Sequence, residues 1–155
     1  MAINLKVNGV AQSVDVDPEE PLLYVLREEF GLNGVKFGCG LQQCGTCFIL
    51  ADGEATPTCV RTCESFEHMD ILTIEGLAND DRLHPLQETF FEEQAAQCGY
   101  CLNGMLIAGL SLLKKNSKPT EDEIRTALDK VICRCGTHTR FIRAVKKASE
   151  NNSKF

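Results

Sequence analysis

Basic residues are scarce in this chain: 16 lysines and arginines stand against 22 aspartates and glutamates, which gives a formal net charge of -6 at pH 7. No lysine or arginine stripe offsets this charge, so the composition argues against non-specific nucleic-acid binding, and no nucleic-acid partner is expected. The longest apolar run, near residues 105–113, is too short to cross a bilayer. No membrane span is expected either.

Targeting and catalytic motifs are also missing. No N-terminal segment combines basic residues, an apolar core and a small-residue cleavage site, so we see no export signal and expect a cytoplasmic location. The sequence contains no G-x-G-x-x-G segment, P-loop, nucleophile elbow or H-E-x-x-H segment. His68, His84 and His138 lack metal-ligand spacing and are expected at the surface or beside a site. We therefore expect no catalytic residue on this chain.

Cysteine, by contrast, is abundant, with nine in 155 residues. An odd number of cysteines without a secretory signal argues against a disulfide framework and favours reduced thiolates that hold metal. One group reads C-x4-C-x2-C followed by a fourth cysteine, which is the plant-type [2Fe-2S] spacing. A second group joins a C-x2-C pair to a C-x-C pair across 31 residues. The proposed metal ligands are Cys39, Cys44, Cys47 and Cys59 in the first group and Cys98, Cys101, Cys133 and Cys135 in the second.

Glycines lie between the ligands of the first group, at Gly38, Gly40 and Gly45. Two ferric ions, two sulfides and four thiolates together carry a net negative charge, which backbone N–H groups can offset by hydrogen bonding to sulfur. A backbone wrapped that closely needs residues without a Cβ atom. The glycines therefore favour an iron-sulfur site over a surface loop with accidental cysteines.

Two alternatives remain open on spacing alone. The second group could hold structural zinc, because four-thiolate zinc sites use similar spacing, although a C-x-C pair is less usual there. In the first group, Cys63 could compete with Cys59 as fourth ligand, but Cys59 follows the expected strand and turn more naturally. Cys63 is then a free or packed thiol. Helix N-termini are expected beside the second group, with their positive ends toward the anionic cluster.

Patterning predicts an α+β chain with two units. In the first unit, apolar and polar residues alternate over positions 3–16 around Asn8-Gly9, which predicts a hairpin. A helix is expected to begin at Pro21 and to stop at Gly31. Strands are expected over residues 47–51 and 71–75, with a turn at Asp52-Gly53. A mixed sheet crossed by one helix beside a glycine-rich loop is the ferredoxin-like β-grasp arrangement. The polar segment 77–82 marks the expected boundary.

Beyond residue 83 the apolar period is helical, and four short helices predict a small four-helix bundle. The expected apolar face of the first is Leu83, Leu86, Phe90 and Phe91. Residues 105–113 form a buried central helix. Thr120 and Glu123 make a capping box that starts the third helix, with Ile124, Leu128, Val131 and Ile132 on one side. The fourth helix carries Phe141, Val145 and Ala148.

These cysteine motifs resemble those of the small iron-sulfur subunit of the molybdenum hydroxylases, the xanthine oxidase family that includes aldehyde oxidoreductases and carbon monoxide dehydrogenase. The matching segments are residues 36–40, 43–47, 97–101 and 132–136, so the resemblance covers nearly the whole chain. Among these enzymes, the motifs are most similar to those of nicotinate and isoquinoline dehydrogenases. Two sites in this order and spacing nearly eliminate the zinc alternative.

The resemblance implies a β-grasp ferredoxin-like domain over residues 1–76 and a helical [2Fe-2S] domain over residues 77–155, with the second cluster nearest to molybdenum. A large partner subunit would hold the molybdopterin cofactor, often the cytosine dinucleotide form in bacteria, and would insert a water-derived oxygen into a C–H bond of an N-heteroaromatic or aldehyde substrate. Gln97 would contact the pterin, since its amide both donates and accepts. Cys135 would link the second cluster to the pterin amino group.

The same resemblance leaves two electron acceptors open. Electrons would pass either to an FAD-binding medium subunit or to a cytochrome c domain. The second acceptor is used by some enzymes of the nicotinate and isoquinoline dehydrogenase branch, which the Gly136-Thr137-His138 segment of this chain resembles. A folded partner exported by the twin-arginine route would instead carry the chain into the periplasm. The alternative function is a free-standing two-cluster electron carrier, which needs no pterin-facing glutamine and no large apolar interface.

Overall fold

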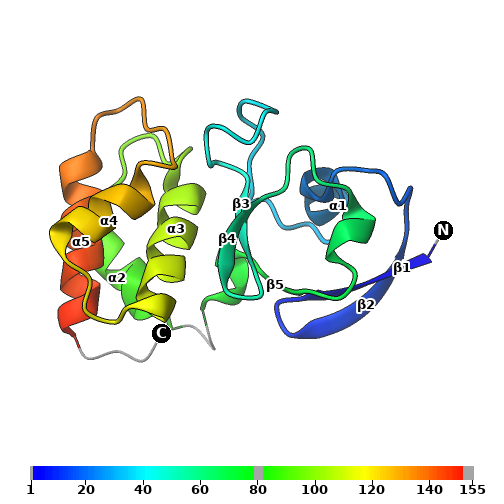
Figure 1. Cartoon of the computed structure of the whole chain (residues 1–155), viewed down its shortest axis with the longest axis horizontal. Coiled ribbons are helices and arrows are strands. Elements are labelled where there is room, and N and C mark those ends of the chain that lie inside the picture. The colour runs from blue at the N-terminus through cyan, green and yellow to red at the C-terminus, as the bar shows by residue number, and fades with distance from the viewer. Residues whose placement is uncertain (1, 79–81, 152–155) are drawn as a thin grey trace.

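A five-stranded mixed sheet forms the N-terminal half of the computed structural model, which describes residues 2–78 and 82–151 (Figure 1). The strands lie in the order β2-β1-β5-β3-β4, and β1 pairs parallel to β5 while the other neighbours are antiparallel. Their bounds are β1 Ala2–Val7, β2 Val10–Asp15, β3 Phe48–Ala51, β4 Glu54–Pro57 and β5 Asp70–Leu72.

Both predicted hairpin turns are confirmed. Asn8 and Gly9 adopt φ angles of 50° and 82°, and Asp52 and Gly53 adopt 50° and 83°. Two successive residues with positive φ match the right-handed twist of the flanking strands, which explains why Asn-Gly and Asp-Gly occupy these turns. The pairing Val7 to Val10 fixes the register of the first hairpin.

Helix α1, Leu22–Glu28, buries its apolar residues against the sheet. It begins after Pro21, as predicted, but ends earlier than the expected stop at Gly31. The first core contains alternate side chains of β1, four residues of α1, and Ile49 from β3.

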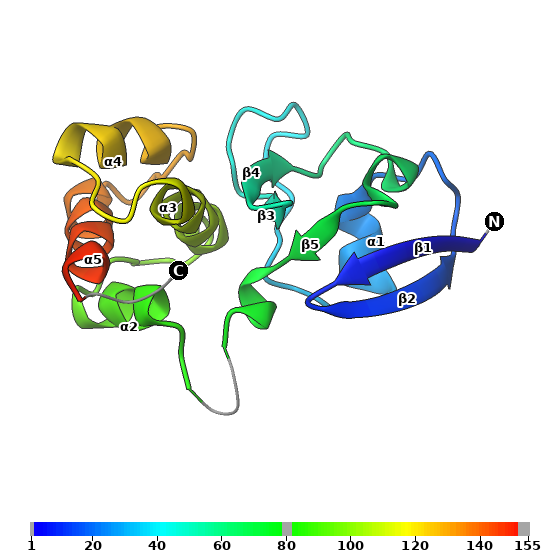
Figure 2. The same ribbon diagram turned by 60° about the horizontal axis from the view of Figure 1, so that its bottom comes forward.

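Helices α2, α3, α4 and α5 form the C-terminal half and confirm the four predicted helices (Figure 2). They span Pro85–Glu92, Leu102–Lys115, Glu121–Leu128 and His138–Glu150. Helix α3 is the central one, because ten of its fourteen residues are buried. The predicted capping box is present: Thr120 accepts a hydrogen bond from the N–H of Glu123, whose carboxylate accepts one from the N–H of Thr120.

Strand β3 is buried on both faces and joins the two halves. Ile49 and Ala51 belong to the core around α1, whereas Phe48 and Leu50 belong to the helical core around α3. Successive side chains of a strand point to opposite faces, so one strand serves two cores. Its position between α1 and α3 is visible in Figure 1.

Three sequence expectations are wrong in detail. The last strand ends at Leu72, and Ile74–Gly76 forms a 3-10 turn instead of continuing to residue 75. Helix α4 ends at Leu128, so Val131 and Ile132 lie beyond it, and Ile132 is 62% exposed. Leu83 and Phe91 do not join the buried face of α2; they are 50% and 81% exposed. Apolar character alone did not predict which side chains the bundle would cover.

The expected boundary segment 77–82 lies partly outside the described residues, at positions 79–81. Leu77 packs in the helical core. Within the described ranges, no helix has the length and apolar character needed to span a membrane.

His84 caps α2 and generates a prediction about pH. Its Nδ1 accepts a hydrogen bond from the N–H of Leu86, while Gln87 Oε1 accepts one from the N–H of His84. Burial, together with Lys114, lowers the pKa of His84 below its ordinary value of 6.5. The neutral form is therefore favoured in the fold, so the cap contributes above about pH 6.5 and is lost as the pH falls further.

We expect His84→Asn to keep a side-chain acceptor without the titration. Loss of an N-cap costs about 1 kcal/mol, so the unmodified chain should lose about that much more unfolding free energy than the variant between pH 7 and pH 5. Thermal unfolding at both pH values measures this difference. An equal loss in the two proteins would show that His84 does not control the cap.

Candidate metal centres

Backbone N–H groups surround the sulfurs of the first predicted centre. Cys39 Sγ accepts hydrogen bonds from the N–H groups of Leu41 and Gln43 at 3.3 and 3.2 Å. Cys44 Sγ accepts one from the N–H of Cys39 at 3.3 Å, and the N–H of Thr58 donates to Cys47 Sγ at 3.4 Å. The chain therefore supplies the donors that anionic sulfur requires.

The Cys59 thiol completes this group. It lies near the thiols of Cys47 and Cys39. Burial, reinforced by those neighbouring thiols, raises the pKa of Cys59 to about 11. Burial also acts to raise the pKa of Cys39, but the N–H groups of Leu41 and Gln43 lower it to about 7. Four thiols held this closely are costly to ionise together unless a bound cation balances them.

Two glycines of this loop are needed for space. A methyl group at Gly38 would lie 2.6 Å from both Cys44 Sγ and Thr46 Oγ1. Gly45 has a φ of 72°, and a methyl group there would lie 2.7 Å from the carbonyl oxygen of Lys130. The loop thus fits a cluster that the backbone must approach closely, as the sequence predicted.

Cys63 stays apart from this arrangement. Its side chain is fully buried in the first core, and its N–H donates to the carbonyl of Glu20 at 2.7 Å. Burial, together with the nearby Glu20 and Glu67 carboxylates, raises the pKa of the Cys63 thiol to about 11. These properties support a packed thiol and favour Cys59 as the fourth ligand.

The second predicted centre lies at the N-terminal ends of α3 and α5. Cys101 is the N-cap residue of α3, and Cys135 lies two residues before Thr137, the N-cap residue of α5. Thr137 Oγ1 is 3.6 Å from Cys133 Sγ. Both helices therefore direct their positive ends toward the thiols, as expected.

The four thiols of this group lie near enough to influence one another. Cys98 is affected by Cys135 and Cys133, and Cys101 by Cys133 and Cys98. The N–H of Tyr100 and then the Cys135 thiol lower the pKa of Cys98, whereas burial and the nearby Cys133 raise that of Cys101 to about 12. Burial differs across the site, because Cys98 is exposed and Cys101 is buried.

Neither group has the geometry of a site for one ion. Across residues 2–78 and 82–151, no three His, Cys, Asp or Glu side chains converge where a single metal ion would sit.

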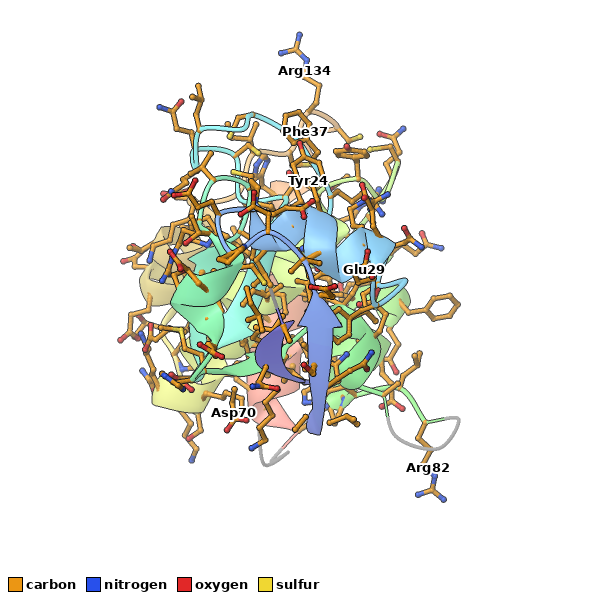
Figure 3. All side chains as sticks on the ribbon, turned by 90° about the vertical axis from the view of Figure 1, so that its right-hand side faces the viewer. Tyr24, Glu29, Phe37, Asp70, Arg82 and Arg134 are labelled. Atoms are coloured by element: carbon orange, nitrogen blue, oxygen red, sulfur yellow. The ribbon has the colours of Figure 1, made fainter. Side chains whose placement is uncertain are left out.

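Gln97 and Cys135 line the same cavity, of about 430 Å³, beside the second centre. Arg140 and Arg143 also line it, which makes the cavity polar and positively charged. Arg134, between the last two cysteines, points away from the ribbon into solvent (Figure 3).

Sequence reasoning missed the contacts that join the two ligand loops. The N–H of Ile132 donates to the carbonyl of Cys44 at 3.0 Å. Tyr100 Oη donates to the carbonyl of Phe37. The ring of Phe37 stacks on that of Tyr24, and both residues are labelled in Figure 3. Asn103 donates to the carbonyls of Thr46 and Phe48. No periodicity or spacing links these residues, since each of the hydrogen bonds joins segments about 55 to 90 positions apart.

Two family models divide the chain as the cysteines do. Residues 5–70 match the "2Fe-2S iron-sulfur cluster binding domain", and residues 73–146 match the "[2Fe-2S] binding domain". A nicotinate dehydrogenase subunit of Pseudomonas putida is 44% identical over 98% of this chain and 97% of its own length. The chain belongs to the small iron-sulfur subunits of the molybdenum hydroxylases.

Further relatives agree with this family. The alpha subunit of isoquinoline 1-oxidoreductase from Brevundimonas diminuta is 41% identical over 96% of this chain and 97% of its own. The crystal structure of quinoline 2-oxidoreductase from Pseudomonas putida 86 superposes with a TM-score of 0.91 at 35% identity, covering 99% of this chain and 98% of that one. In the aldehyde oxidoreductase of Desulfovibrio desulfuricans, at a TM-score of 0.92 and 35% identity, the match covers 97% of this chain and 17% of a longer one.

Membership confirms the main sequence predictions. This small iron-sulfur subunit combines a ferredoxin-like domain with a helical domain, binds two [2Fe-2S] clusters and serves an oxidoreductase complex in electron transfer. The zinc alternative for the second group is therefore wrong, and the free-standing carrier is not favoured.

Gly38 provides a test of the first centre. We expect Gly38→Ala to reduce the iron content from about four to about two atoms per chain, because the new methyl group displaces Cys44 Sγ while the second centre stays intact. Gly53→Asn is the matched control, since Gly53 has open space around it and asparagine tolerates its positive φ. Iron analysis of both variants measures the effect. A full iron complement in Gly38→Ala would contradict the close approach.

Proposed function

We propose that this subunit receives electrons from a molybdenum centre on a large partner subunit, then passes them through its two clusters to an FAD-binding medium subunit or a cytochrome c domain. The complex hydroxylates an N-heteroaromatic or aldehyde substrate, the classes that the relatives' names describe. No catalytic residue is assigned to this chain, whose role is to hold and connect redox centres.

The observation that carries the proposal is the shared cavity of Gln97 and Cys135. Gln97 is exposed and free to present its amide to a heterocycle edge, which needs both donors and an acceptor. Cys135 reaches the same cavity as a proposed ligand of the second cluster. We assign this face to the pterin of the large subunit, in its cytosine dinucleotide form.

In this assignment Cys39, Cys44, Cys47 and Cys59 hold the first cluster, and Cys98, Cys101, Cys133 and Cys135 hold the second. Each cluster, when bound, supplies one-electron redox chemistry. Backbone N–H groups at the first site and helix ends at the second stabilise the extra negative charge of the reduced state. The two ligand sets divide between residues 1–76 and 77–155, the proposed domains.

Among the hydrogen bonds that join the two ligand regions, one involves a proposed ligand residue of the first site and the direct neighbour of a ligand of the second. The carbonyl of Cys44 accepts the N–H of Ile132, and Ile132 is bonded directly to Cys133. Electronic coupling between the two ligand sets is stronger along a path of backbone bonds and one 3.0 Å hydrogen bond than across empty space of the same length. This contact supports transfer of electrons within the chain.

A second feature supports an obligate subunit over the free-standing carrier. Phe91 and Leu83 are exposed beside an apolar cavity that Gln97 also lines. Exposed aromatic surface of this kind is typical of a face that a partner covers. We place the complex in the cytoplasm, or in the periplasm where a folded partner is exported with it.

Electron paramagnetic resonance of the dithionite-reduced complex tests the function. We expect two distinct [2Fe-2S] signals, with about four iron atoms per molybdenum in the same sample. Gel filtration of the chain expressed alone should show aggregation or, once it is mixed with the large subunit, tight association. A well-behaved monomer that ignores the large subunit would instead support the free-standing carrier.

Gln97→Ala tests the pterin contact. We expect both clusters to assemble while reduction by substrate slows about tenfold, the effect of removing one or two hydrogen bonds from a positioned contact. The matched control is Gln12→Ala, which removes the same amide from an exposed position on β2. Stopped-flow reduction of the complex measures the rate. Unchanged kinetics in Gln97→Ala would count against the contact.

A further inference from the structure

Asn103 joins the two halves of the molecule through a buried side chain. It is 1% exposed in the first turn of α3. Its Nδ2 donates to the carbonyl of Thr46 at 2.8 Å and to that of Phe48 at 2.9 Å. These two carbonyls flank Cys47, a proposed ligand of the first cluster, while Asn103 itself lies two residues after Cys101, a proposed ligand of the second.

Among the described residues, the Asn103 side chain finds hydrogen-bond partners through its donor nitrogen and not through its oxygen. Asn103 Oδ1 is the one buried side-chain oxygen or nitrogen without a hydrogen-bond partner among the described residues. An unpaired buried acceptor is costly, and an apolar side chain of similar size would avoid that cost. The residue is therefore poorly explained by packing, and its two donated bonds are what distinguish it from leucine.

The neighbouring backbone leaves little freedom at this junction. A methyl group at Gly104 would lie 2.3 Å from the carbonyl oxygen of Gly45, so α3 starts in direct contact with the first ligand loop. The hydrogen bond from the N–H of Ile132 to the carbonyl of Cys44 anchors the same loop. Asn103 thus fixes the loop where it contacts the start of α3.

The geometry points to Asn103 as a positioning residue that sets the separation and coupling of the two clusters. This inference rests on the proposed function, because both ligand sets must hold clusters for their separation to matter. The rate of electron tunnelling falls exponentially with distance, so a small shift of the Thr46–Phe48 carbonyls relative to α3 would slow transfer between the clusters. Asn103 acts on the clusters only through these carbonyls.

Ser111 provides a matched control in the same helix. Its Oγ accepts from the N–H of Ala55 at 3.2 Å and donates to the carbonyl of Gly53 at 3.2 Å. Ser111 therefore also joins α3 to the sheet by two hydrogen bonds, but at the β3–β4 turn, two turns of helix further from the ligands. Ser111→Ala should lower stability without changing the clusters.

The test uses the complete complex with three variants: Asn103→Asp, Asn103→Leu and Ser111→Ala. Asn103→Asp keeps the shape but places an acceptor against two carbonyls, and Asn103→Leu removes the donors without adding charge. Electron paramagnetic resonance measures the magnetic splitting between the two reduced clusters. Rapid freeze-quench measures the lag, which is the time between reduction of one cluster and reduction of the other. We expect both Asn103 variants to retain about four iron atoms, lose the splitting and lengthen the lag. Ser111→Ala should retain the splitting and the lag of the unmodified complex.

Several results would overturn the inference. Unchanged splitting and lag in both Asn103 variants would do so. An equal loss of splitting and an equally lengthened lag in Ser111→Ala would do so as well. Failure of both Asn103 variants to assemble, with Ser111→Ala intact, would assign Asn103 to folding instead of positioning. Two clusters without splitting in the unmodified complex would end the inference but leave the proposed function, whereas a missing second cluster would overturn the proposed function itself.

Discussion

Placing several thiolates together inside a protein is the constraint on which the rest of this structure depends. A buried negative charge is stable only when donors or positive dipoles compensate it. The first centre uses N–H groups of a loop, as at Leu41 and Gln43, and so requires glycines where the backbone approaches sulfur. The second centre uses the N-terminal ends of α3 and α5 and so requires a helical domain. Two solutions to one electrostatic problem explain why the chain has two different folds.

The junction between these folds follows from the same constraint. Strand β3 contributes alternate side chains to both cores, and it begins at Phe48, directly after Cys47. The ligand loop thus leads into the element that both halves share. Asn103 of α3 then donates to the buried carbonyls of Thr46 and Phe48, on either side of Cys47. The contacts that pack the two halves together therefore also hold the proposed ligand loop in place.

The sequence predicted those features that local chemistry determines. Turn dipeptides such as Asn8-Gly9, the capping box at Thr120, the four helices and the two cysteine groups all follow from spacing or conformational preference. It did not predict the donated bonds of Asn103, because they depend on what a distant segment places beside that side chain. The cap at His84 is local, within residues 84–87, but was missed because histidine is not among the preferred N-cap residues. The exposure of Phe91 was missed because hydrophobicity does not distinguish a core from a surface that a partner covers.

The cysteines of the two centres differ in how far they are exposed to solvent. Cys44, Cys47 and Cys59 are buried within this chain, whereas Cys98 is exposed at the second centre. Solvent exposure helps to set the potential of an iron-sulfur cluster, so a partner that covers this face, as proposed, would change the potential of the second centre. Arg134, between two proposed ligands of this centre, extends from the chain into solvent. In the proposed complex, the partner therefore changes the surroundings of the second centre more than those of the first, three of whose four proposed ligands are already buried.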